Sequence, residues 1–73
     1  MAKDERERAA EERGRKHAQI LSEMERISAQ VAQIQGRMGN LRTQAELDVA
    51  TTQIAKLQER LLDKAEEIKA LFR

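Results

Sequence analysis

The chain of 73 residues contains no cysteine and no proline, and Phe72 is its single residue among Phe, Tyr and Trp. The lack of cysteine excludes disulfides and thiolate metal sites, and a composition that is 37% charged is typical of long helices rather than sheets. With 14 basic and 13 acidic side chains, the chain has no basic excess of the kind that a general phosphate-binding surface needs. No apolar run reaches the length of a membrane span or a secretory signal, so we expect one cytoplasmic domain, residues 1–73, with no membrane partner.

Residues 1–16 are predicted to form a charged, solvent-exposed helical extension. Opposite charges recur four residues apart, as in Glu11 and Arg15, and each such pair stabilises a helix by about 0.2–0.5 kcal/mol. Gly14 weakens this helix. The many carboxylates favour a solvated helix over a second interpretation, in which four residues form a docking patch for phosphate or an acidic partner: Arg13, Arg15, Lys16 and His17.

A regular apolar stripe begins at Ile20. Its members are spaced alternately by four and three residues, which is the a/d seam of a heptad repeat. They are Ile20, Met24, Ile27, Val31, Ile34, Met38 and Leu41. The stripe predicts a helix over about residues 3–39 that packs along one side in a paired coiled-coil region, residues 17–73.

The stripe changes register between residues 36 and 46. Continuing it would place Asp48 and Thr52 in the seam and leave Leu47 out, a shift of two residues that a continuous coiled coil does not absorb. We therefore predict a turn over about residues 39–43. The alternative is one long helix with a glycine-softened middle in a parallel oligomer, since glycine in a helix costs only about 1 kcal/mol.

The residues at this turn suit the end of one helix and the start of another. Gly39 and Asn40 tolerate the left-handed backbone conformation in which helices commonly end. Thr43 and Glu46 form a capping box: the hydroxyl accepts from an amide of the new helix, and the carboxylate reaches back to the cap amide.

A second stripe predicts a helix over about residues 44–72. Its members are Leu47, Ala50, Ile54, Leu57, Leu61, Lys64, Ile68 and Leu71. The predicted fold is therefore all-α, an antiparallel two-helix coiled-coil hairpin that assembles into a helical bundle. Zipping the stripes places Met24 level with Leu61, but farther from the turn Ile20 meets Lys64 and His17 meets Ile68.

The C-terminal end of the second helix thus carries apolar side chains without aliphatic partners on the first. We predict that four of them bind a partner: Leu62, Ile68, Leu71 and Phe72. A frayed C-terminus is the alternative. A core one seam wide in so small a chain usually needs oligomerisation, so the expected partner is another protein helix or a second copy, with a dimeric four-helix bundle favoured. Glutamine and alanine on the flanks of the turn-proximal half offer a further oligomer contact, or simply a solvated face.

No motif for catalysis is present. His17 has no second nitrogen or thiolate to share a metal ion, the hydroxyls have no base at helical spacing, and the glycines form no phosphate loop. We expect no enzyme, cofactor or metal, but a protein–protein interaction module that serves as subunit, adaptor, co-chaperone or inhibitor. The alternative is an RNA-binding helical bundle with a basic patch at one end, formed by Arg13, Arg15, Lys16, Lys69 and Arg73.

Overall fold

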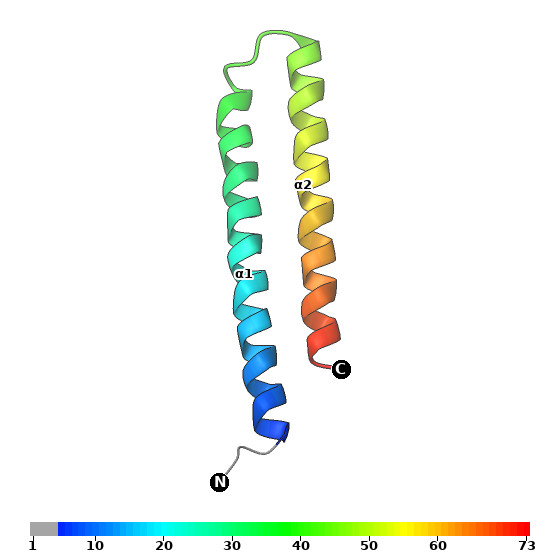
Figure 1. Cartoon of the computed structure of the whole chain (residues 1–73). Helices are drawn as coiled ribbons and strands as arrows, with labels where there is room; N and C mark the ends of the chain where they lie inside the picture. The colour runs from blue at the N-terminus through cyan, green and yellow to red at the C-terminus, as the bar shows by residue number, and fades with distance from the viewer. Residues whose placement is uncertain (1–4) are drawn as a thin grey trace.

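Two helices make up the hairpin. The computed structural model describes residues 5–73, in which α1 (Glu5–Met38) and α2 (Gln44–Leu71) run antiparallel side by side (Figure 1). The predicted all-α hairpin is confirmed, and the alternative of one long helix is wrong. Both helices end one residue before the predicted ends, while the predicted start of the first helix near residue 3 lies outside the described residues.

The hairpin is long and thin. Its extents are 65 × 17 × 10 Å, and its radius of gyration is 18.0 Å, against about 11 Å for a compact domain of this length. Its accessible surface is 6128 Å², whereas a compact monomer of 8.4 kDa exposes about 4,600 Å². Two helices alone therefore leave about 1,500 Å² more surface in water than a compact fold would.

The core follows the predicted seam. Every residue of the two stripes is buried or half-buried, whereas nearly all other described residues are exposed. Only Ile27, Ile34 and Ala50 are buried within residues 5–73, at 4%, 8% and 7% exposure. Because each helix contributes a single apolar stripe, the hairpin has a core one seam wide.

Helix α1 ends by tightening its last turn. The Asn40 amide donates to the Arg37 carbonyl at 3.0 Å and the Leu41 amide to the Met38 carbonyl at 3.2 Å, so both bonds span three residues. No described residue, glycine or other, has a positive φ. The predicted left-handed ending at Gly39 and Asn40 is therefore wrong.

Helix α2 begins at a cap that matches the prediction in part. Thr43 has an extended backbone, and its hydroxyl accepts from the Glu46 amide at 3.1 Å. The Glu46 carboxylate accepts from the amide of Arg42 at 3.2 Å, one residue before the predicted donor. The cap thus satisfies the orphan amide of Glu46, and the Glu46 carboxylate holds the preceding loop residue Arg42 against the start of α2.

Candidate interaction surface

The two faces of the hairpin differ in charge. With Met24 and Leu47 at position a of their heptads, the g positions of both helices flank the seam on one face and the e positions flank it on the other. The charged flank consists of the g residues Lys16, Glu23, Gln30, Arg37, Glu46, Gln53, Arg60 and Glu67. The neutral flank consists of the e residues over the length where α1 and α2 lie side by side, beyond which the next e residue of α1 is Glu7: Gly14, Leu21, Ser28, Gln35, Thr51, Gln58, Ala65 and Phe72.

Side chains of the charged flank are complementary across the seam. From the turn outward, the facing positions are Arg37 and Glu46, Gln30 and Gln53, Glu23 and Arg60, and Lys16 and Glu67. The members of each facing pair line a common surface hollow. A slip of one heptad in either direction would oppose Glu23 to Glu67 or Lys16 to Arg60. Each exposed pair contributes at most about 1 kcal/mol, but together they favour one alignment.

Lys64 places a cation in the seam. Its ammonium forms ion pairs with Glu23 of α1 and with Glu67, the latter at 3.3 Å. The hydrogen bond to Glu23 is the main cause that raises the pKa of Lys64, with Glu67 adding to it and partial desolvation opposing it. Lys64 also shares a hollow with Ile20, as the predicted layer requires. Sequence analysis missed Glu23, although its place three residues after Ile20 on α1 was a signal for it.

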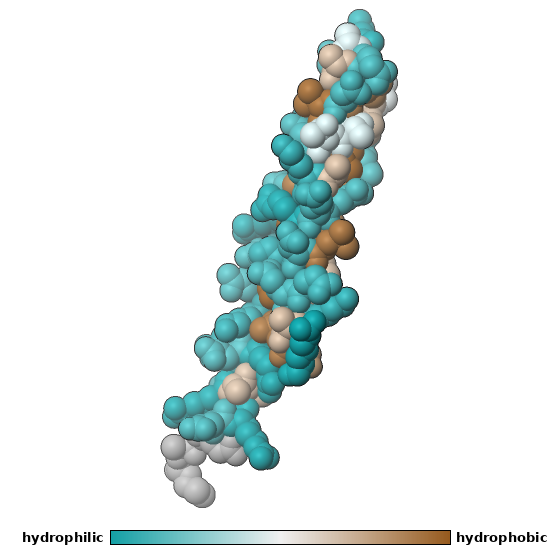
Figure 2. All heavy atoms as spheres, turned by 90° about the vertical axis from the view of Figure 1, so that its right-hand side faces the viewer, coloured by the Kyte–Doolittle hydropathy of each residue, from teal (hydrophilic) through white to brown (hydrophobic). Residues whose placement is uncertain are grey.

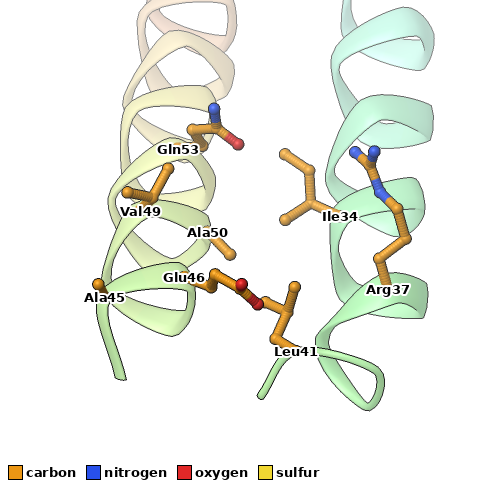
Figure 3. A pocket seen from close by; sticks show the side chains of 8 residues that line it. All are labelled: Ile34, Arg37, Leu41, Ala45, Glu46, Val49, Ala50 and Gln53. Carbon is orange, nitrogen blue, oxygen red and sulfur yellow. The ribbon is translucent and has the colours of Figure 1, made fainter. Parts of the chain in front are cut away.

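A hollow of 410 Å³ opens on the face of the charged flank near the turn. Ile34 and Ala50 point toward each other at its floor (Figure 3), and the small Ala50 side chain leaves the space above it empty. Arg37, Glu46 and Gln53 line its sides. Although these three side chains are polar or charged, most of the surface that lines the hollow is apolar.

The structure divides the predicted C-terminal cluster. Ile68 and Leu71 are half-buried at seam positions, whereas Leu62 and Phe72 are 68% and 60% exposed. The Phe72 ring packs edge to face against the His17 ring, with 5.4 Å between the ring centroids, so the His17 side chain covers part of Phe72. Sequence analysis missed this contact. Leu62 and Phe72 are thus the more exposed members of the predicted cluster.

Large apolar side chains are exposed chiefly on the face of the neutral flank. Leu21, at 42% exposure, and Phe72 belong to the flank itself, and Leu62 lies at the adjoining b position. Val49, at 59% exposure, lies on the opposite face at a c position beside the hollow. In Figure 2 the outer surface of α2 is mostly hydrophilic, with hydrophobic groups near the turn end and about midway along it. The seam pattern alone does not indicate Leu21, because Leu21 follows the seam residue Ile20 and lies outside the a and d positions.

The five predicted basic residues lie at the end of the hairpin where α2 finishes beside α1 (Figure 1). All five are exposed: Arg13, Arg15, Lys16, Lys69 and Arg73. Lys69 pairs with Glu66 at 3.3 Å, and Glu67 shares a hollow with Lys16. Carboxylates are thus interleaved with the cations, which does not favour a phosphate-binding surface.

No protein-family model, curated protein or solved structure matches this chain in sequence or fold comparisons. Neither helix has a stretch that is both long and apolar enough to cross a membrane.

Proposed function

We propose that the chain is a non-enzymatic, cytoplasmic protein–protein interaction module that acts as subunit, adaptor, co-chaperone or inhibitor by packing its neutral flank against other helices. One observation carries this proposal: Leu21, Leu62 and Phe72 are exposed on a face whose flank positions carry no charge. Burial of each such side chain contributes up to about 1.5–3 kcal/mol. A hairpin that buries only three of the residues from 5 to 73 has much to gain from such packing.

Small side chains make this face suitable for another helix. Between the exposed leucines and the turn, small side chains occupy half of the e and b positions, at Ser28, Ala32, Thr51 and Ala55, and the others carry Glu25, Gln35, Asp48 and Gln58. Ala18 and Ala65 lie on the other side of the leucines. Short side chains let a second helical layer approach closely, so that the large side chains insert between them. The proposed binding therefore uses helix-in-groove packing of mainly apolar contacts.

In-cell photo-crosslinking tests the proposal. A photo-reactive amino acid replaces Leu62 in one variant and Lys56 in a matched control; both positions are exposed on α2, but Lys56 lies on the face of the charged flank. We expect position 62 to crosslink to a protein, either a second copy or another chain, in clear excess over position 56. Equal crosslinking at both positions, or none at position 62, would contradict the proposal.

Salt dependence separates helix packing from nucleic-acid binding. Association through apolar contacts should hardly change between 50 and 500 mM NaCl, whereas binding to RNA through phosphate contacts should weaken by orders of magnitude. RNA binding that is lost when Arg13, Arg15 and Lys16 are changed to glutamine would favour the basic patch over the neutral flank.

A further inference from the structure

We infer that the occupant of the neutral flank is a second copy of this chain, packed face to face about a twofold axis so that Leu21 and Leu62 of the two copies meet. This inference rests on the proposed function, because it names the partner of the same surface. Four features of the molecule support it: the height of the two leucines, the sizes of their neighbours, the lack of charge, and the area available.

Leu21 and Leu62 lie at the same height on the two helices. Leu21 falls between Ile20 and Met24, and Leu62 falls between Leu61 and Lys64, so both side chains lie between the same two seam layers. This height is close to the middle of the neutral flank. A twofold axis through it brings the two leucines of one copy onto the two leucines of the other, which forms a single layer of four.

The sizes of the remaining side chains are complementary in such a dimer. If the second copy runs antiparallel to the first, Phe72 of one copy lies between the heights of Thr51 and Ala55 of the other, where short side chains leave space. If it runs parallel, Phe72 lies at the height of Gly14, where an added Cβ would meet nothing within 4 Å in the single hairpin. In both cases a large ring meets a small residue, so Phe72 does not obstruct the approach.

The charges also fit a second copy better than a charged partner. The eight residues of the neutral flank carry no ionisable side chain, so the contact requires no buried ion pair and creates no repulsion between identical surfaces. Four of the adjoining b positions carry ionisable side chains, which are exposed in the single hairpin: Glu11, Glu25, Asp48 and Lys69.

The available area reaches the lower limit for a specific dimer. The flank runs about 32 Å along α1, at 1.5 Å per residue, and the hairpin is 17 Å wide. This gives about 550 Å² of face per copy and about 1,100 Å² for two, which exceeds the roughly 1,000 Å² that a specific interface needs. It would also cover part of the surface that the thin hairpin leaves in excess of a compact fold.

Sedimentation equilibrium of the purified chain tests the inference with a matched pair of variants. Leu62→Glu places a carboxylate in the proposed leucine layer, and Val49→Glu does the same on the opposite face of α2 at a similarly exposed position. Both side chains are exposed in the single hairpin, so both variants should keep their helix content by circular dichroism. We expect the wild type and Val49→Glu to sediment as dimers, and Leu62→Glu to raise the dissociation constant by about 100-fold or more, because two leucines are lost per dimer. Leu21→Glu should act in the same direction.

Two results would overturn the inference: a wild-type chain that stays monomeric up to about 1 mM, where even a Kd of 1 mM would populate dimers, or a dimer that Leu62→Glu and Leu21→Glu leave intact. A monomeric chain whose position 62 still crosslinks to a different protein in cells would overturn the second-copy inference and leave the proposed function standing. Failure of both experiments would overturn both.

Discussion

Truncating the most buried side chain should remove a large part of the stability of the hairpin. Ile27 is 4% exposed, so the change Ile27→Ala takes nearly its full apolar contribution from the seam and leaves a cavity. Such truncations lower the free energy of unfolding by about 2–5 kcal/mol. The better helix propensity of alanine returns only a few tenths of a kcal/mol. At about 0.05–0.15 kcal/mol per residue, a chain of this length has about 4–11 kcal/mol in total.

The assay is urea unfolding followed by circular dichroism at 222 nm, at one fixed chain concentration because association would shift the apparent stability. Val49→Ala is the matched control, since Val49 lies outside the seam and is 59% exposed; we expect a change within about 0.5 kcal/mol. In thermal unfolding, each kcal/mol lost should lower the midpoint by about 4–8 °C. Similar losses for Ile27→Ala and Val49→Ala would refute the conclusion that the a/d seam stabilises the hairpin.

Three further predictions concern the helix ends and the seam cation. Thr43→Ala should lower the free energy of unfolding by about 0.5–2 kcal/mol through loss of the cap to the Glu46 amide, while Thr43→Ser should retain it; urea titrations compare the two. Gly36→Ala should raise the free energy of unfolding by about 0.5–1 kcal/mol, because the added Cβ meets nothing within 4 Å. Gly39→Ala should not lower the free energy of unfolding; a loss above about 1 kcal/mol would indicate that the helix ends in the left-handed conformation. The pKa of Lys64 is raised above 10.5 in the folded chain, so its ion pair with Glu23 stabilises the fold below pH 10.5, and this contribution is lost as the pH rises through the folded pKa. The difference in free energy of unfolding between wild type and Glu23→Gln should therefore shrink between pH 9 and pH 12. A difference that stays constant over this range would contradict the prediction.

The seam was predictable because it depends on period alone. Spacings of three and four residues place Ile20 to Met38 on one side of any α-helix, whatever the neighbouring residues are, and the register change at Leu47 can be read from the same spacing. The two helices and the turn between them therefore followed from the sequence to within one residue at their described ends.

The details of the turn were less predictable because two local solutions are available to the same residues. Gly39 permits a left-handed ending but does not require it, and the chain uses bonds that span three residues instead. The Glu46 carboxylate can reach either of two neighbouring amides, and it accepts from that of Arg42. Such choices depend on the path of the whole connection, which sequence spacing does not specify.

The side-chain partners on the surface were the least predictable part of the site. Lys64 has Glu67 three residues away on its own helix, yet it also reaches Glu23 on the other helix. His17 was assigned to the layer of Ile68, but its ring contacts Phe72. Long side chains can reach across a layer or along a helix, so their partners follow only from coordinates in three dimensions.

The contrast between the two flanks bears on why the neutral flank exists. Complementary charges on the g positions already favour a single alignment of α1 on α2, as the opposition of Glu23 to Glu67 after a slip shows. Complementary charges on the e positions would favour the same alignment further and would keep the face of the neutral flank in water. Folding of the hairpin by itself therefore gives no reason to leave the e positions uncharged. Leu21 and Phe72 are instead exposed there at a loss of apolar burial. We therefore propose that this face serves a contact made after folding, and the similar heights of Leu21 and Leu62 favour a second copy of the chain as the partner.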